Sequence, residues 1–321
     1  MRISVIIATK DRRESLLRTM KSLQQQTLSD FEIIVVDNAA DPHVAWAIEE
    51  FNETARVKVL YLTHNSGGIS GARNAAVKLA RGDLLAFTDD DLTFDTNWLA
   101  SHVEKFIEHP EMAAAGGRIE PYWQKKPPQW LLEYIGESKS FPILALLDLS
   151  DRFSISSDNI FFGANMVIKR EVLSEYGGFQ PSYINGRTVG SSEWGIVLRL
   201  QKAGRLIGYL PHAIVYHHIP EDRMTVEYVR KWAWHAGAGE MYERWLHRRR
   251  TLFSFIREAV RIALKYWRLW VKTWVVRNRR DPESIDVQFR SSLGRCELKY
   301  TWWMFSDRGI KAALNSGGSQ L

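Results

Sequence analysis

The feature that most constrains the fold is an alternation of short apolar segments with helical patterns over the first 90 residues. Four apolar runs rich in β-branched residues occur at residues 2–9, 31–36, 57–62 and 84–88, and each is too short for a typical helix. Helical patterns fill the intervals between them. Strands and helices that alternate at this spacing predict a parallel, doubly wound α/β sheet covered by helices on both faces.

The pattern is less regular after residue 110. We expect further strands at 112–119, 159–168, 206–210 and 213–216, a helix over 193–203, and an irregular proline-rich loop over 121–142. From about residue 222 the composition becomes helical, basic and aromatic. We therefore predict an α/β domain over residues 1–221 and a helical appendage over 222–321.

Polar side chains stand where the predicted strands end. Thr9 and Asp11 follow the first strand, Asp37 ends the second, and Asp89-Asp90-Asp91 follows the fourth. Because ligands bind at the carboxyl ends of the strands in open α/β sheets, these side chains are expected to face one crevice. The alignment of polar residues with strand ends is the first functional signal in the chain.

The acidic triplet 89–91 is a candidate metal site. Three adjacent carboxylates repel one another, and burying them without a partner is costly. A hard divalent cation, Mg²⁺ or Mn²⁺, would relieve this repulsion and keep open positions for a diphosphate. A solvated acidic loop or a helix N-cap is the alternative. The position at a strand end, facing a predicted crevice, favours the metal.

A glycine-rich turn at residues 65–71 leads into a helix. It lacks the G-x-G-x-x-G spacing and follows the third strand, so it does not indicate dinucleotide binding. Arg73, just inside the helix, could pair with a phosphate or a base carbonyl. A surface arginine is the alternative for this position.

Seven short segments, in order, resemble family 2 glycosyltransferases of the GT-A fold. They are Ser4–Arg12, Ile34–Asn38, Gly71–Ala76, Phe87–Asp91, Gly163–Met166, Tyr176–Phe179 and Gly190–Trp194, the last leading to Arg199-Leu200. The resemblance covers about residues 3–220. It implies an inverting enzyme that moves a sugar from a nucleoside-diphosphate sugar, with a UDP-sugar as the expected donor, to a hydroxyl of a saccharide or lipid-linked acceptor.

The resemblance also implies roles for individual residues. The donor nucleotide would be bound by Thr9, Asp11, Asp37, Arg73, Asp89 and Asp90. Asp91, the last residue of a D-x-D motif, would hold Mn²⁺ or Mg²⁺. The pair His217-His218 lies where relatives carry a histidine near the metal, and strand alternation sends the two rings to opposite faces. We therefore expect His217 alone to reach the metal, although a structural role for the pair is the alternative.

Glu193 is the expected catalytic base. The family usually shows Glu-Asp at the start of a helix, and counting back from Arg199-Leu200 places Glu193 at the second acid, with Ser192 in place of the first. A helix N-terminus stabilises the charged carboxylate, so a raised pKa would need a desolvating neighbour, for which Trp194 is a candidate. Without the resemblance, Glu193 would be an ordinary first-turn acid.

Four residues are candidates for binding the acceptor: Arg118, Trp123, Asn165 and Trp194. Aromatic faces suit sugar rings, and arginine or asparagine side chains suit hydroxyl groups. Core packing explains the two tryptophans equally well.

The tail contains a basic amphipathic helix. Ile256, Val260, Ala263, Trp267, Trp270 and Trp274 fall on one helical face, and Arg257, Arg261, Lys265, Arg268 and Lys272 on an adjacent one. Such a helix is typical of a segment that lies on an anionic membrane surface, here within residues 245–280. Packing on the other domain or on a second subunit is the alternative, which leaves an oligomer open.

Composition narrows the remaining classes. Twelve of the 43 Lys and Arg residues lie in residues 244–280 with one acid, so the rest of the chain is not basic and general nucleic-acid binding is not indicated. The single cysteine, Cys296, excludes an internal disulfide framework and suits a reducing compartment. We expect a cytoplasmic protein, peripheral on the inner face of the membrane. The rival functions are a nucleotidyltransferase, which should carry a glycine- and lysine-rich loop after the first strand, and a non-catalytic nucleotide- or sugar-binding protein.

Overall fold

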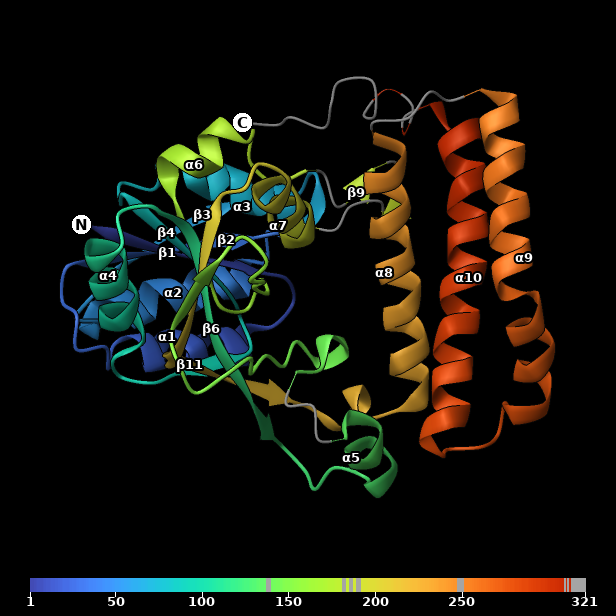
Figure 1. Cartoon of the computed structure of the whole chain (residues 1–321). Coiled ribbons are helices and arrows are strands. Elements are labelled where there is room, and N and C mark those ends of the chain that lie inside the picture. Colours follow the sequence, from blue (N-terminus) through green and yellow to red (C-terminus); the bar gives the residue numbers. More distant parts are fainter. Residues whose placement is uncertain are drawn as a thin grey trace.

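The computed structural model describes residues 1–136, 140–180, 183–184, 187–188, 192–246, 251–308, 310 and 312. Figure 1 shows an α/β part built around a twisted sheet and, beside it, a layer of long helices at the C-terminal end of the chain. Gly190 and Ser191 of the last motif, and residues 247–250 of the basic segment, lie outside the described residues.

The main sheet has the strand order β3-β2-β1-β4-β8-β6-β11-β5, with β7 paired to β11 outside this path. The strands are β1 (Ile3–Thr9), β2 (Phe31–Asp37), β3 (Val59–Thr63), β4 (Leu84–Asp89), β5 (Leu92–Phe94), β6 (Met112–Trp123), β7 (Ser154–Ser156), β8 (Met166–Lys169) and β11 (Leu206–Ile219). Strands β1 to β4 are parallel, as predicted, whereas β5 and β8 run antiparallel to their neighbours. Two further strands of two residues each, β9 (Tyr183–Ile184) and β10 (Arg187–Thr188), pair with each other outside this sheet.

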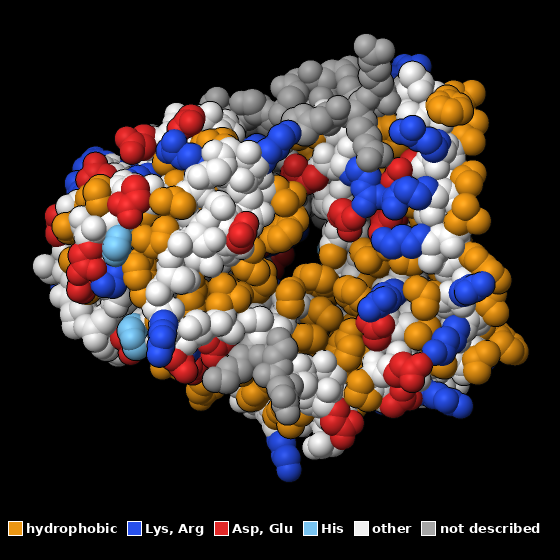
Figure 2. All heavy atoms as spheres, viewed as in Figure 1, with side chains coloured by type: hydrophobic (Ala, Val, Ile, Leu, Met, Phe, Trp, Pro, Cys, Tyr) orange, Lys and Arg blue, Asp and Glu red, His pale blue; other side chains and the backbone are white. Residues whose placement is uncertain are grey.

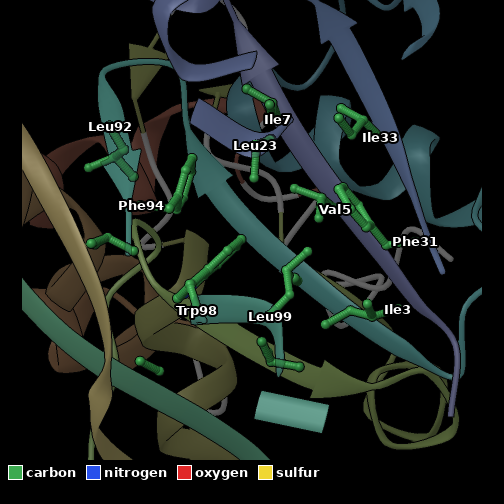
Figure 3. Packing of buried hydrophobic residues seen from close by; sticks show 14 of the residues in the cluster. Ile3, Val5, Ile7, Leu23, Phe31, Ile33, Leu92, Phe94, Trp98 and Leu99 are labelled. Atoms are coloured by element: carbon green, nitrogen blue, oxygen red, sulfur yellow. The ribbon is translucent and has the colours of Figure 1, made fainter. Parts of the chain in front are cut away.

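Helices cover both faces of the sheet. One face packs on α1 (Arg13–Leu23), α2 (Pro42–Thr54) and α4 (Trp98–Glu108), and the other on α3 (Gly68–Leu79), α6 (Arg170–Glu175) and α7 (Ser192–Lys202). Alternation along β1 explains the two cores, because Val5 and Ile7 enter the first while Ile6 enters the second. Figure 3 shows the first core, where Trp98 lies among the strand side chains. The predicted α/β fold class is confirmed.

Several sequence-based expectations differ from the structure. Residues 206–210 and 213–216 form one strand, β11, with a register shift between Leu210 and Val215; Pro211 lies in this stretch and has no N–H for the ladder. The expected loop over 121–142 contains the end of β6, helix α5 (Gln129–Ile135) and the 3₁₀ turn η1 (Pro142–Leu144). Of the expected strand 159–168, only the part from Met166 is a strand, because the backbone turns at 162–165.

The helical layer contains α8 (Val226–Leu246), α9 (Leu252–Val276) and α10 (Pro282–Ser306), after a 3₁₀ turn η2 (Glu221–Arg223). Helix α10 packs against both α8 and α9 and lies between them (Figure 1). The predicted C-terminal helical region is therefore present, while the division at residue 221 stays a prediction. In the described part of the chain, no helix is long and apolar enough to cross a bilayer.

Candidate functional site

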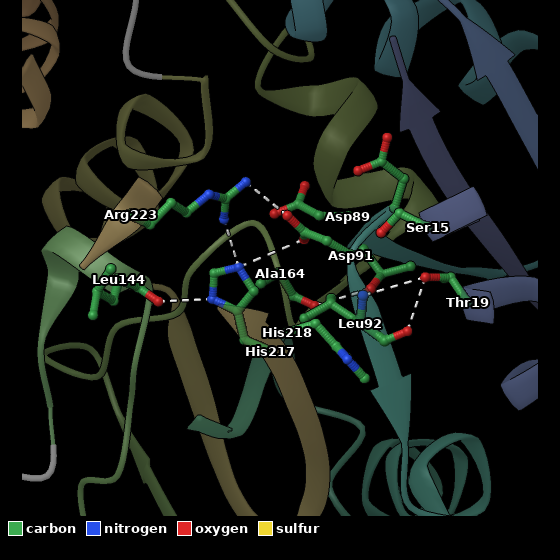
Figure 4. Close-up of polar contacts among 12 residues, drawn as sticks. Ser15, Thr19, Asp89, Asp91, Leu92, Leu144, Ala164, His217, His218 and Arg223 are labelled. Carbon is green, nitrogen blue, oxygen red and sulfur yellow. Dashed lines mark hydrogen bonds and ion pairs between the residues drawn. The ribbon is translucent and has the colours of Figure 1, made fainter. Parts of the chain in front are cut away.

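The site forms where β4 ends and the chain turns into β5. Asp89 is the last residue of β4, and β5 pairs antiparallel with β11 so that Leu92 lies opposite His217. This pairing, which the sequence did not predict, brings Asp91 and His217 together, with 3.6 Å between a carboxylate oxygen of Asp91 and Nε2 of His217. Figure 4 shows both side chains directed at the same point. His218 turns the other way, toward Thr93 and the ring of Tyr122.

Two arginines that the sequence analysis did not assign to the site, Arg12 and Arg223, neutralise the carboxylates of Asp90 and Asp91. Nη1 of Arg12 donates to Asp90 at 3.1 Å and to Asp91 at 3.0 Å. Arg223, at the end of η2, donates to Asp91 and to Nε2 of His217, both at 2.8 Å (Figure 4). Arg223 is only six residues beyond His217, but no spacing rule links it to Asp91, which is 132 positions earlier in the chain.

Burial and neighbouring charges affect the three aspartates differently. Desolvation raises the pKa of Asp89, and it raises the pKa of Asp90 to about 6 with help from the charge of Asp91. Desolvation also acts upward on Asp91, but its contact with the His217 imidazole and the charges of Arg223 and Arg12 outweigh burial and hold its pKa below the usual range. Asp91 is thus the most firmly ionised member of the triplet.

Arg73 connects the acidic triplet to Glu193. Its guanidinium is buried and lies 3.2 Å from Asp89 through Nη2 and 3.2 Å from Glu193 through Nη1. A side chain on Gly163 would come within 2.7 Å of Nη2, so the glycine leaves room for the guanidinium. One buried cation therefore holds the expected base and an expected donor carboxylate on the same side of the sheet, and Arg73 is not a surface residue.

The expected nucleotide residues do not all face one cavity. Thr9, Asp89 and Asp90 line a cavity of about 450 Å³ whose wall also includes Asn38, His217 and the apolar side chains of α8 and η1. Asp37 is fully buried at the end of β2, where its carboxylate accepts hydrogen bonds from the backbone N–H groups of Ala39 and Asp41 and from the hydroxyl of Tyr61. Desolvation and this hydrogen bond raise the pKa of Tyr61 to about 12.

The structure does not bring Asp11 to this cavity. Asp11 has a positive φ of 57°, which turns its side chain outward, and it lines a separate cavity of about 540 Å³. Arg12, Asp91 and Arg223 form the wall common to the two cavities. Asp11 therefore does not share one crevice with Thr9, Asp89 and Asp90, and its nucleotide-binding role stays a prediction.

The acceptor candidates are dispersed. Asn165 is fully buried and satisfied, because its oxygen accepts from Trp98 at 2.9 Å and its nitrogen donates to the carbonyl of Ala213 at 2.8 Å, so it cannot line an acceptor site. Arg118 is held by Asp148 and Asp151, and Trp123 packs in the core below α5. Trp194, next to Glu193, is the remaining candidate that is exposed.

Asp91 and His217 suit a catalytic divalent cation. Nδ1 of His217 lies 2.8 Å from the carbonyl oxygen of Leu144 and donates to it, so Nε2 is the ring nitrogen that faces Asp91 and Arg223. Across the described ranges, no group of three or more His, Cys, Asp or Glu side chains is arranged to hold a metal. A cation at this point would have two protein ligands and would take the others from a substrate or water, which is how hard cations bind substrate phosphates.

Comparison with solved structures bears on the fold. A mannosyltransferase from Pyrobaculum calidifontis, solved with GDP-Man and Mn²⁺, superposes on 99% of this chain and 76% of its own with a TM-score of 0.55 at 17% identity. This likeness is one of fold, and it confirms the GT-A architecture that the sequence motifs implied.

Curated relatives point the same way. The chain is 26% identical over 239 residues to a glucosyl-dolichyl phosphate glucuronosyltransferase of Haloferax volcanii, covering 71% of this chain and 73% of the relative. It is also 26% identical over 231 residues to the succinoglycan biosynthesis protein ExoM of Rhizobium meliloti, covering 70% of each. Residues 4–177, more than half of the chain, match the family described as glycosyl transferase family 2. The chain belongs to this family of transferases.

Proposed function

We propose that this protein is an inverting glycosyltransferase that uses Glu193 as its base to move a sugar from a nucleoside-diphosphate sugar, a UDP-sugar in the first instance, to a hydroxyl of a saccharide or lipid-linked acceptor. The observation that carries the proposal is the position of Arg73 between Asp89 and Glu193. A base and a donor carboxylate that share one guanidinium lie close enough to act on the two sides of one sugar.

The residues have complementary tasks in this mechanism. Glu193 takes the proton of the acceptor hydroxyl as that oxygen attacks the anomeric carbon, and the nucleoside diphosphate leaves from the opposite face. Asp91 and His217 would hold Mn²⁺ or Mg²⁺, which supplies neutralisation of the charge on the leaving diphosphate. Thr9 and Asp89 line the cavity of about 450 Å³, which we call the donor cavity. Arg12 lies in its wall, where it can contact phosphate oxygens. One base without a covalent intermediate gives inversion at the anomeric carbon.

Glu193→Gln tests the proposal, because it removes the base and nearly preserves size. We expect transfer to fall about 1,000-fold or more, measured as release of UDP or GDP from a panel of nucleotide sugars with Mn²⁺. Binding of the nucleoside diphosphate, measured by thermal shift, should remain. Glu171→Gln, an exposed first-turn acid of α6 on the same face of the sheet, is the matched control. Turnover of the Glu193 variant within tenfold of the wild type contradicts the role of Glu193.

We also propose that α9 binds an anionic membrane surface. Its outer side carries a stripe of exposed apolar side chains, at spacings of three and four residues, which Figure 2 shows along the edge farthest from the sheet. The stripe consists of Phe253, Ile256, Val260, Leu264, Trp267, Val271 and Trp274, each between 49% and 74% exposed. The sequence placed Ala263 and Trp270 on this face, but Trp270 turns toward α10, where its Nε1 donates to the carbonyl of Ser291.

Charge favours a lipid surface over a second copy of the chain. A band of exposed basic residues runs along one flank of the stripe: Arg257, Arg261, Lys265, Arg268 and Lys272. The single acid of α9, Glu258, is buried. An antiparallel two-fold pairing of α9 helices would place the two basic bands on the same side of the contact, where they repel. Anionic headgroups complement the band while the acyl region receives the stripe.

Trp267 and Trp270 supply a matched pair for the membrane proposal. We expect Trp267→Ala to weaken sedimentation with phosphatidylcholine vesicles containing 30% phosphatidylserine about tenfold, with no change in melting temperature. Trp270→Ala should instead lower the melting temperature, because that ring packs inside the helical layer. Equal vesicle binding by the wild type and the Trp267 variant contradicts the proposal. A dimer that Trp267→Ala dissociates, without vesicle binding, would assign the stripe to a second copy.

A further inference from the structure

Arg223 occupies the point at which the two expected metal ligands meet. Its Nη2 lies 2.8 Å from Asp91, and its Nη1 lies 2.8 Å from Nε2 of His217. One guanidinium therefore bridges the carboxylate and the imidazole, which are themselves 3.6 Å apart (Figure 4). A protein cation stands where the mechanism needs a metal cation.

The two cations cannot share His217. Its Nδ1 is committed to the carbonyl of Leu144, so Nε2 offers a single lone pair. That lone pair accepts a hydrogen bond from Arg223 or coordinates a metal, but it cannot do both. Binding of a metal to His217 thus requires Arg223 to leave.

Charge repulsion also favours the departure of Arg223 when a metal binds. Arg12 also contacts Asp91, at 3.0 Å, so this carboxylate already has two guanidinium partners. A divalent cation added beside both arginines would be repelled by two positive charges a few ångströms away, which is a strong effect in a partly buried site. Departure of Arg223 removes one of these repulsions and frees an oxygen of Asp91.

The donor supplies a destination for the released side chain. The planar guanidinium forms bidentate hydrogen bonds with phosphate oxygens. Arg223 lines the donor cavity of about 450 Å³ and also the neighbouring cavity of about 540 Å³, so there is space on both sides of its present position. It ends a 3₁₀ turn of three residues, between β11 and α8.

We propose that Arg223 is an internal cation that holds Asp91 and His217 until the donor diphosphate arrives, and that this exchange couples metal binding to nucleotide binding. The inference rests on the metal dependence proposed above and adds a positioning residue to it. Without nucleotide, Arg223 competes with the metal; with nucleotide, it moves to the diphosphate, and the metal binds to the ligands that it leaves.

The test is direct Mn²⁺ binding, followed by electron paramagnetic resonance, to the full chain with and without UDP or GDP. The wild type is expected to bind Mn²⁺ at least about tenfold more tightly with one of these nucleotides than without. Arg223→Gln, which keeps a polar side chain but no charge, should tighten nucleotide-free Mn²⁺ binding at least about tenfold and reduce the coupling to nucleotide. Arg223→Lys, which keeps the charge, should stay within about threefold of the wild type without nucleotide.

Arg13→Ala is the matched control. Arg13 lines the same 540 Å³ cavity, so its removal takes away a nearby positive charge without touching Asp91 or His217. Its nucleotide-free Mn²⁺ affinity is expected within about twofold of the wild type. If Arg223→Gln binds nucleotide-free Mn²⁺ no more tightly than the wild type, or if Arg13→Ala tightens binding equally, the exchange is wrong while metal dependence stands. If the wild type binds Mn²⁺ with neither nucleotide, the proposed metal dependence is wrong as well.

Discussion

Buried carboxylates meet arginines in two regions of this molecule, the proposed donor site and the helical layer, and the two clusters differ in their surroundings. At the donor site, Asp90 and Asp91 contact Arg12 and Arg223, and these side chains form walls of two open cavities. In the helical layer, Glu258 of α9 is held by Arg244 of α8 at 2.7 Å and by Arg261 at 2.6 Å. There Arg244 lies largely enclosed between the helices, while Arg261 reaches Glu258 from the exposed side of α9.

The ionisation of the acids follows this difference. At the donor site, desolvation dominates for Asp90 and raises its pKa to about 6, whereas neighbouring charges hold the pKa of Asp91 below the usual range. In the helical layer, desolvation acts upward on Glu258, but the hydrogen bonds and charges of Arg261 and Arg244 outweigh it and lower its pKa to about 2. The charge of Glu258 is thus compensated by its arginines, whereas burial outweighs the cations around Asp90, whose charged form a further cation would stabilise.

The largest effect on stability is expected from Arg244→Met, which removes a cation shared by Glu258, Glu240 and, at 3.8 Å, Glu297. Removing one partner of a buried ion pair is strongly destabilising, even though Arg261 still contacts Glu258, so the free energy of unfolding in urea should fall by about 3 kcal/mol. Arg290→Met, which breaks an exposed pair with Asp286, is the control and should change it by less than about 0.5 kcal/mol.

The comparison is broken if Arg223→Gln destabilises the protein as much as Arg244→Met. We expect the Arg223 variant to stay within about 1 kcal/mol of the wild type, because Asp91 keeps Arg12 as a partner and the cluster lines two cavities. A loss of equal size would mean that both clusters are structural.

A change of pH is expected to have a smaller effect on the free energy of unfolding, with opposite signs in the two clusters. Because the folded-state pKa of Asp90 is raised, its stabilising contribution is present below its unfolded pKa of 3.8 and is lost as pH rises through about 6. Because that of Glu258 is lowered, its contribution is present above 4.5 and is lost as pH falls through about 2, at roughly 2 kcal/mol in total.

Amide hydrogen exchange, corrected for its intrinsic pH dependence, separates the two contributions. Between pH 6 and pH 3, protection of peptides from α9 should decrease while that of peptides across β4 and β5 should not. Glu258→Gln should remove the decrease in α9. Parallel changes in both regions would show that the clusters do not titrate independently.

The sequence predicted the parts of the fold that depend on local pattern. The parallel strands β1 to β4 follow from apolar runs, and their polar ends gave Thr9, Asp89 and Asp91 as site residues. Strand β5 was not predicted, because its three residues, Leu92–Phe94, are too few to show a periodic pattern. The pairing of β5 with β11 places His217 beside Asp91. Because the local sequence pattern did not reveal β5, only the family resemblance predicted this contact.

The missed and misplaced site residues share a physical cause. Arg12 was passed over in favour of Asp11, because strand alternation does not anticipate the positive φ that turns Asp11 away. Arg223 enters through a 3₁₀ turn after the longest strand, far in sequence from its carboxylate. The amide side chain of Asn165 is of a type that binds sugar hydroxyls, but its four hydrogen-bonding contacts lie inside the protein. Side-chain type alone does not distinguish these cases.

The position of α10 between α8 and α9 has a geometric consequence for the acceptor. If α9 rests on a bilayer, the donor cavity, whose wall includes Tyr228 and Trp232 of α8, lies at least two helix spacings from the lipid, or about 16–20 Å. The helical layer would then act as a fixed spacer, and transfer would take place at a set height above the membrane. Such a spacer selects for acceptors whose reactive hydroxyl extends that far from its anchor.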